Sequence, residues 1–171
     1  MALPANADGF TVTSSSIPAQ WLLPLRYAFN GNGTDNTPCG GGNVSPQVAW
    51  TNAPAATQSL AVVLFDVDGG KGLGTVHWVT YGIAPGVTVL PEGAGSAASS
   101  MMMGGVGTAG SQTYRGPCAP HGDAPHHYVL SVYALDLAPG AFTPGLTRDA
   151  LFALMKGHFL GATSTVANFV R

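Results

Sequence analysis

Residues 114–136 read YRGPCAPHGDAPHHYVLSVYALD, a loop that runs into a strand. Three of the chain's five histidines, His121, His126 and His127, lie in this stretch together with Cys118, one of the two cysteines. Gly, Pro and Asp are enough to turn a loop, so a simple connection needs neither the imidazoles nor the thiol. The composition of this loop therefore points to a site.

The strand HYVLSVYALD begins with residues that can do chemistry. His126 and Tyr128 are two positions apart at its start. Side chains of a strand alternate between its two faces, so both are expected on one face, and His127 on the other. His121 follows Pro120 in the middle of the loop and is expected in solvent.

Two other segments carry polar residues in or at the end of apolar strands. VVLFDVDGG (62–70) ends on Asp66 and Asp68, which alternation places on one face, toward a cleft or toward solvent. The alternative is that both aspartates only cap a turn before the two glycines. His77 lies inside TVHWVTYGI (75–83), where a lone histidine is more often a satisfied core group than a ligand.

The composition indicates one compact β domain, which we expect to span residues 1–171. Only 8% of the residues are charged, against a usual value of about 25%, while 46% are hydrophobic and 24 are glycine. The net charge is −2 and the six Lys and Arg residues are scattered singly, so no basic stripe is present for nucleic acid. Nucleic acid is therefore excluded as a partner.

The chain shows no transmembrane segment, because apolar runs such as LAVVLF (60–65) are far shorter than the roughly 20 residues of a bilayer span. The start, MALPANADGF, lacks the basic and apolar regions of a signal peptide, although ANA before Asp8 resembles the residues left after signal cleavage. We interpret the protein as periplasmic or secreted, with a cytoplasmic location as the alternative. Residues 1–8 are expected to form a flexible N-terminus.

Apolar patterns bounded by Gly and Pro predict five strands, at residues 10–13, 47–50, 59–67, 76–83 and 127–136. The Gly-, Ala- and Ser-rich residues 91–112 have no periodicity and predict a long surface loop. This loop is either a flexible flap over a site or plain disorder.

One short helix is predicted near the C-terminus in TRDALFALMKG (147–157). Thr147 is the expected N-cap, with Asp149 in the first turn and Gly157 as the stop. The apolar residues expected on one face are Leu151, Leu154 and Met155.

Taken together, these segments resemble in order and spacing the signatures of the phosphatidylethanolamine-binding protein family, also called Raf-kinase-inhibitor-like proteins, in its bacterial type. The matching segments are CGGGNVSPQVAW (39–50), SLAVVLFDVDGG (59–70), VHWVTYGI (76–83), residues 114–136 and MKGHFLGATSTVANFVR (155–171). The chain departs from the family pattern at Val67, Gly69 and Ala119, where proline is usual, and at His127, where arginine is common. These departures concern the ligand preference of the pocket rather than the fold.

The resemblance implies an antiparallel β fold with a large central sheet, a smaller sheet and a short helical element near the C-terminus. It also implies a small anion-accepting pocket at one end of the large sheet. The residues that match this pocket and its Gly- and Pro-rich wall are Asp66, Asp68, His77, Gly116, Cys118, Pro120, His126 and Tyr128. Cys39 and Cys118 belong to motifs around the pocket and are expected to form a disulfide if the protein is exported.

We expect a binding module for a phosphate-bearing small molecule or a phosphoethanolamine-like head group, which could modulate a kinase or a protease partner. Asp66 would either orient an imidazole or take the ammonium group of the ligand. The alternative is an enzyme in which Asp66 and His77 act as a general acid/base pair, with Tyr128 as a donor.

No metal or other cofactor is expected. A zinc site built from Cys118, His121, His126 and His127 is disfavoured, because its spacing is irregular and the adjacent histidines would face opposite ways. Cys118 also lacks the signature of an activated thiolate.

Overall fold

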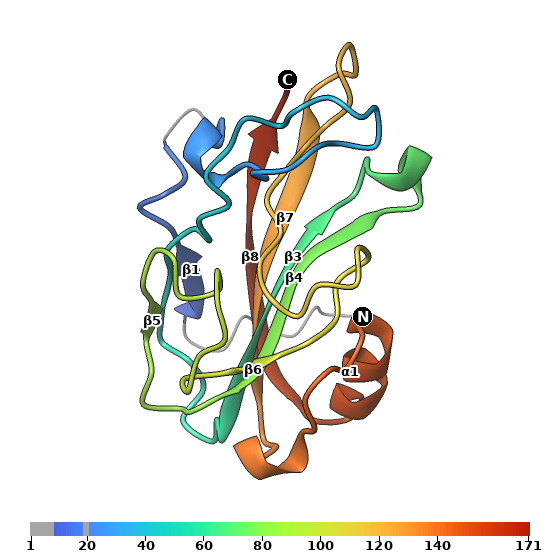
Figure 1. Cartoon of the computed structure of the whole chain (residues 1–171). Coiled ribbons are helices and arrows are strands. Elements are labelled where there is room, and N and C mark those ends of the chain that lie inside the picture. Colours follow the sequence, from blue (N-terminus) through green and yellow to red (C-terminus); the bar gives the residue numbers. More distant parts are fainter. Residues whose placement is uncertain (1–8, 19–20) are drawn as a thin grey trace, which may run out of the picture.

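Figure 1 shows a computed structural model of the chain, which describes residues 9–18 and 21–171. The expected flexible N-terminus at residues 1–8 lies outside the described residues. The larger sheet has the order β6-β4-β3-β7-β8, with strands at Met103–Gly104, Thr75–Ile83, Ser59–Asp66, His126–Leu135 and Phe159–Phe169. The smaller sheet has the order β1-β2-β5, with strands at Thr11–Thr13, Val48–Thr51 and Val89–Leu90.

All paired strands in both sheets are antiparallel, so the expected mainly β fold with two sheets is confirmed. The five predicted strands are β1, β2, β3, β4 and β7, each within one residue of its predicted bounds. The sequence patterns did not predict β5, β6 or β8. Short 3₁₀ turns occur at Leu25–Tyr27, Gly70–Gly72 and Pro139–Ala141.

Strand β3 explains why the central sheet is stable. It pairs with β4 on one side and β7 on the other, and both of its faces are covered. Leu60, Val62 and Leu64 pack into the core between the two sheets. Ala61 and Val63 pack into a second core that also contains residues of the helix. A strand buried on both faces needs a continuous apolar run, which is what its sequence provides.

Helix α1 spans Arg148–Met155, with the predicted N-cap at Thr147, whose side chain accepts the N–H of Ala150 at 3.2 Å. Leu151 and Met155 are fully buried. Leu154 is 37% exposed, so the expectation that it shares the buried face is wrong. Phe152, rather than Leu154, joins Leu151 and Met155 in packing against the core.

No helix within residues 9–18 and 21–171 is long and apolar enough to cross a bilayer. The eight residues of α1 are less than half of the roughly 20 that a span requires.

The site is positioned by the pairing register at one end of the larger sheet. Asp66, the last residue of β3, pairs with Thr75 at the start of β4 and with Tyr128 near the start of β7. Three strand ends therefore meet there, toward the top of Figure 1, whereas α1 covers the sheet near the bottom. Residues of these three strands that are far apart in the sequence are brought together by this register.

Candidate functional site

A pocket of about 720 Å³ lies where β3, β4 and β7 meet. It is lined by all eight residues that the sequence predicted, namely Asp66, Asp68, His77, Gly116, Cys118, Pro120, His126 and Tyr128. The structure therefore brings the three predicted segments to one place.

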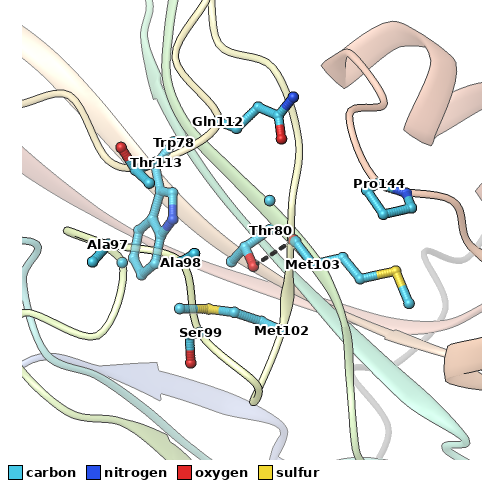
Figure 2. A pocket seen from close by; sticks show the side chains of 12 residues that line it. Trp78, Thr80, Ala97, Ala98, Ser99, Met102, Met103, Gln112, Thr113 and Pro144 are labelled. Atoms are coloured by element: carbon cyan, nitrogen blue, oxygen red, sulfur yellow. Dashed lines mark hydrogen bonds between the residues drawn. The ribbon is translucent and has the colours of Figure 1, made fainter.

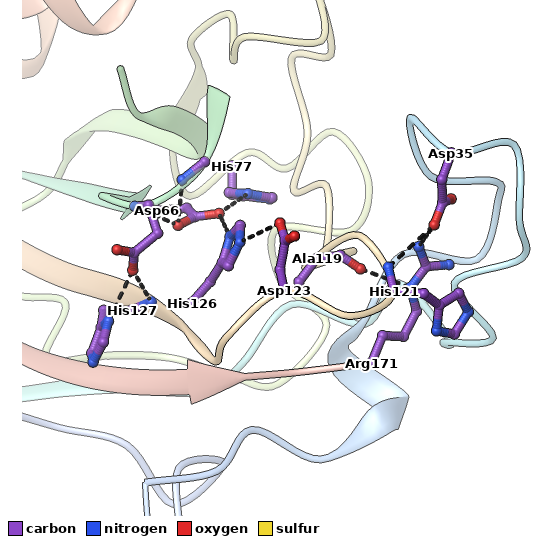
Figure 3. A network of polar contacts seen from close by, with 11 residues as sticks. Asp35, Asp66, His77, Ala119, His121, Asp123, His126, His127 and Arg171 are labelled. Atoms are coloured by element: carbon purple, nitrogen blue, oxygen red, sulfur yellow. Dashed lines mark hydrogen bonds and ion pairs between the residues drawn. The ribbon is translucent and has the colours of Figure 1, made fainter. Parts of the chain in front are cut away.

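Asp66 is the central polar group of the pocket and is 3% exposed. One carboxylate oxygen, Oδ1, accepts the backbone N–H groups of Asp68 and Gly69, both at 3.0 Å. The other, Oδ2, lies 2.8 Å from Nδ1 of His126 (Figure 3). Asp66 thus both caps the turn after β3 and orients an imidazole.

The charge of Asp66 is stabilised by its neighbours. Burial alone would raise the pKa of this carboxyl group, but the imidazoles of His77 and His126 outweigh burial and lower the pKa to about 2. His77 contributes at a longer range, with its Nε2 atom 3.9 Å from Oδ2 of Asp66. A buried carboxylate with these partners stays ionised at neutral pH.

His126 lies between two carboxylates. Its Nδ1 atom faces Asp66 at 2.8 Å, and its Nε2 atom lies 3.4 Å from Oδ2 of Asp123. Both ring nitrogens must carry a proton to donate to both carboxylates, which favours the imidazolium form. Burial would lower the pKa of His126, but the nearby carboxylates, Asp66 above all, raise it.

His77 is turned into the pocket by an irregularity in β4. Trp78 pairs with Leu64 and Val76 pairs with Phe65, so His77 is the extra residue of a β-bulge. Bulges re-aim side chains, and here the imidazole lies edge-on to the ring of Tyr128, with centroids 5.2 Å apart.

The polar contacts of His77 fix which nitrogen is available. Its Nδ1 atom donates to the carbonyl oxygen of Arg115 at 2.8 Å, so Nε2 is left on the side of Asp66 and the pocket. His77 is thus held at one nitrogen and available at the other. The adjacent Trp78 packs in the core between the sheets.

Tyr128 contributes a buried hydroxyl group. The residue is fully buried, and within residues 9–18 and 21–171 its hydroxyl has no hydrogen-bond partner. Burial, followed by the charge of Asp66, raises the pKa of Tyr128, so the hydroxyl keeps its proton. It is therefore an unused donor at the wall of the pocket, which a ligand reaches only when the surrounding side chains shift.

A second aspartate–histidine pair lies at the edge of the site. Oδ2 of Asp68 accepts the backbone N–H of His127 at 2.7 Å and lies 2.8 Å from Nδ1 of that residue. The hydrogen bonds from His127 lower the pKa of Asp68. The side chain of His127 is 55% exposed and does not line the pocket, as alternation predicted for the neighbour of His126.

Several pocket residues were missed in the sequence. Lys71, Thr75, Thr108, Arg115 and Asp123 also line the cavity. Lys71 could have been found as the single cation in GGKGLG, the Gly-rich run that directly follows Asp66 and Asp68. Asp123 gives no such signal, because Asp in a Gly- and Pro-containing loop is also ordinary turn chemistry.

One wall of the pocket is fastened by a covalent bond. Cys39 and Cys118 form a disulfide with their Cα atoms 5.4 Å apart, across 79 residues of sequence. Arg171 holds the same region, because it donates to the carbonyl oxygens of Ala119 at 2.8 Å and Pro38 at 3.0 Å. The disulfide and the two hydrogen bonds of Arg171 thus connect the segment around Cys39 to the wall that carries Cys118.

Gly116 is required in this wall by a close approach. A Cβ atom at this position would lie 2.2 Å from the carbonyl oxygen of Tyr27, too near for any side chain. The backbone N–H of Gly116 donates to the side chain of Asn43 at 2.8 Å. The chain can thus pass close to its neighbour only with glycine here.

The segment 91–112 contains β6 and is bonded to its neighbours. Backbone N–H groups of Gly105 and Thr108 donate to β4 at 2.9 and 3.0 Å, and Gly95 donates to the side chain of Ser45 at 2.8 Å. Thr108 reaches the rim of the pocket.

The same segment lines a second cavity of about 320 Å³, shown in Figure 2. Trp78, Met102 and Met103 provide much of its lining. Thr80 lies there as well, but its hydroxyl already donates to the carbonyl oxygen of Met103 at 2.9 Å. This cavity contains no titratable side chain, so the chemistry is concentrated in the larger pocket.

Comparisons with known proteins agree with the fold and with the family resemblance. The family model described as phosphatidylethanolamine-binding protein matches residues 13–170. The chain is 37% identical to Escherichia coli YbcL over 135 residues, which cover 77% of this chain and 71% of YbcL. It is 40% identical over 139 residues to LppC of Mycobacterium tuberculosis, a candidate lipoprotein by name, covering 79% of this chain and 62% of LppC.

The solved structures point the same way. The crystal structure of E. coli YbcL, described as a new member of the mammalian PEBP family, superposes with a TM-score of 0.84 at 29% identity. The alignment covers 95% of this chain and 98% of YbcL. With the family model matching nearly the whole sequence, the chain belongs to the phosphatidylethanolamine-binding protein family.

Proposed function

We propose that this protein binds a small phosphate-bearing molecule or head group of the phosphoethanolamine type in the larger pocket. The observation that carries the proposal is the unpaired hydroxyl of Tyr128, fully buried at the wall of this pocket. An unsatisfied buried hydroxyl costs about 1–3 kcal/mol, which an acceptor oxygen of a ligand would offset. His126 and His77 present a further nitrogen each on the same side.

The charges of the pocket suit a zwitterion better than a simple dianion. Three carboxylates line the cavity, those of Asp66, Asp68 and Asp123. The cationic side chains of Lys71 and Arg115 line it as well, together with the imidazole of His126, whose pKa the nearby carboxylates raise. A phosphate would pair with the cationic side chains and the tyrosine hydroxyl. An ammonium group would pair with a carboxylate that still has free acceptor positions.

Asp66 is not the best partner for that ammonium group. Its oxygens already accept two backbone N–H groups and the imidazole of His126. Asp68 and Asp123 are more exposed, with 42% and 50% of their side-chain surface open to solvent. We therefore assign Asp66 to orienting the imidazole and the ammonium group to one of these two.

General acid/base catalysis by Asp66 and His77 has less support. The nearest distance between them is 3.9 Å, beyond hydrogen-bond range. The pKa of about 2 also makes Asp66 a weak base at neutral pH. A binding role needs neither a closer contact nor a higher pKa.

The disulfide and one relative support a proposal for the compartment in which the protein is located. Disulfides such as Cys39–Cys118 persist in oxidising compartments, so we propose a periplasmic or secreted protein. The relative LppC is named as a candidate lipoprotein, which supports the same proposal. Modulation of a kinase or a protease by the loaded protein belongs to the same proposal and rests on the family resemblance alone.

Calorimetric titration with phosphoethanolamine tests the proposed function. The parent protein should bind saturably, and Tyr128→Phe should lose about tenfold in affinity, because a hydrogen bond to a charged oxygen is removed. Its stability should be unchanged or higher, since the lost hydroxyl has no partner in the fold. Tyr133→Phe is the matched control, because Tyr133 lies on the same strand but packs against Phe152 and Phe159. Equal affinity for the parent and Tyr128→Phe would contradict the proposal.

A further inference from the structure

The outer nitrogen of the pocket imidazole faces a carboxylate of the protein itself. Nδ1 of His126 is taken by Asp66, so Nε2 is the nitrogen that a ligand can reach. Oδ2 of Asp123 lies 3.4 Å from that Nε2 atom (Figure 3). The anion expected in this pocket and the side chain of Asp123 therefore need the same donor.

Asp123 is held loosely compared with Asp66. Its side chain is 50% exposed, against 4% for Asp66. It follows Gly122, whose φ of +89° marks a turn, and residues 121–125 are all exposed. Its backbone N–H donates to the carbonyl oxygen of Pro120 at 3.3 Å. The carboxylate can move out into solvent without breaking any contact of the core.

We infer that Asp123 is a specificity-determining residue, a built-in competitor whose carboxylate holds Nε2 of His126 until a ligand anion replaces it. This inference rests on the proposed function. An anion without a cationic group must displace the carboxylate and then remain near its negative charge. A zwitterion can instead pair its ammonium group with the displaced carboxylate, so Asp123 selects against simple phosphates.

A positioning role for Asp123 predicts the opposite sign. If Asp123 served to hold the imidazole, its loss would weaken binding. The geometry favours the competitor, because Asp66 already fixes the ring from the buried side at 2.8 Å. The groups that face the imidazole come from all the surrounding elements, namely Asp66 at the end of β3, Asp68 just after it, His77 on β4, Tyr128 on β7 and Asp123. Lys71 and Arg115 line the same pocket.

The test compares Asp123→Asn with a matched control by calorimetric titration at about pH 6, within the histidine range. Asparagine keeps the size of the side chain but removes the charge. Methyl phosphate should bind Asp123→Asn about three- to tenfold more tightly than the parent, and phosphoethanolamine should gain less. The control is Asp136→Asn, which breaks the exposed pair of Asp136 and His158, 2.7 Å apart at the other end of β7, and should change neither affinity.

A second readout needs no ligand. Imidazole nitrogen NMR shifts should show that the pKa of His126 is lower in Asp123→Asn than in the parent, because one of its two carboxylate partners is lost. An unchanged pKa of His126 would contradict the contact between Asp123 and His126. Weaker or equal binding of methyl phosphate by Asp123→Asn would contradict the proposed role of Asp123 as a competitor. Failure of the parent and of both variants to bind methyl phosphate or phosphoethanolamine would overturn the proposed function, and this inference with it.

Discussion

At the pocket end of the central sheet the buried side chains include a carboxylate and two imidazoles, whereas at the other end the buried side chains of α1 are apolar. Asp66 and His126 are 3% and 7% exposed, and Leu151 and Met155 are 0% exposed. Burial is thus similar at both ends, but the stabilising forces differ. An ion pair depends on protonation and a disulfide depends on redox state, whereas apolar packing depends on neither. The stability of the pocket end should therefore depend on pH and redox state, whereas the stability of the core beneath α1 should depend on neither.

The largest effect should come from reducing the disulfide at the pocket end. Cys39 and Cys118 close a loop across 79 residues, for which the chain-entropy model gives roughly 4–5 kcal/mol as an upper bound. Denaturant unfolding with and without a reductant measures the loss, with the double variant Cys39→Ser/Cys118→Ser as the control that a reductant should not affect. Equal stability of the parent protein with and without the reductant would show that the disulfide does not stabilise the fold.

The second largest loss of stability should come from a substitution in the apolar core beneath α1. Leu151→Ala should cost about 3 kcal/mol of unfolding free energy, because it leaves a cavity in the core between α1 and the sheet. The cost should be the same from about pH 4 to about pH 8, since none of the side chains in that core titrates in this range. A cost that varies with pH would show that the two ends are not independent.

Asp66→Asn should cost about 2 kcal/mol, and only within a limited pH window. The folded pKa of Asp66 is lowered, so its contribution is present above the unfolded value of about 3.9 and is lost as pH falls toward about 2. The folded pKa of His126 is raised, so its contribution is complete below the unfolded value of about 6.5 and is lost as pH rises through the folded one.

The difference in stability between the parent and Asp66→Asn should therefore be largest between about pH 4 and about pH 6.5. Chemical denaturation from about pH 3 to about pH 9 measures this difference inside the window and on both sides of it. Asp136→Asn is the control, because its partner His158 lies at a similar distance but both side chains are more than 40% exposed, so it should cost less than about 1 kcal/mol. A flat difference for Asp66→Asn would mean that His126 is not charged in the folded protein.

Much of the central sheet could be predicted from the sequence, because its patterns are strong. The continuous apolar run of β3 indicated a strand, and the alternation in β7 indicated that His126 and His127 diverge. Strand β8 was not predicted, since FLGATSTVANF is made mostly of small and polar residues and it forms its ladder by pairing with β7. Pairing of this kind is a tertiary effect.

The sequence indicated which residues belong to the site, but it did not indicate which contacts they make. Asp66, His77 and His126 were noted as polar residues in or next to apolar strands, but only the family resemblance assigned them to one pocket. The bulge that turns His77 inward and the missing partner of the Tyr128 hydroxyl depend on register and packing, which the sequence alone does not display. Asp123 was missed for a similar reason, because the meaning of a loop carboxylate depends on which imidazole lies beside it.

A crystal structure of the protein soaked with phosphoethanolamine would show whether the larger pocket is the binding site. We expect phosphate oxygens within about 3 Å of the Tyr128 hydroxyl and of Nε2 of His126, with the side chain of Asp123 displaced from that nitrogen. Phosphoethanolamine bound elsewhere, for instance in the cavity beside Trp78, with the hydroxyl of Tyr128 still unpaired, would contradict this expectation.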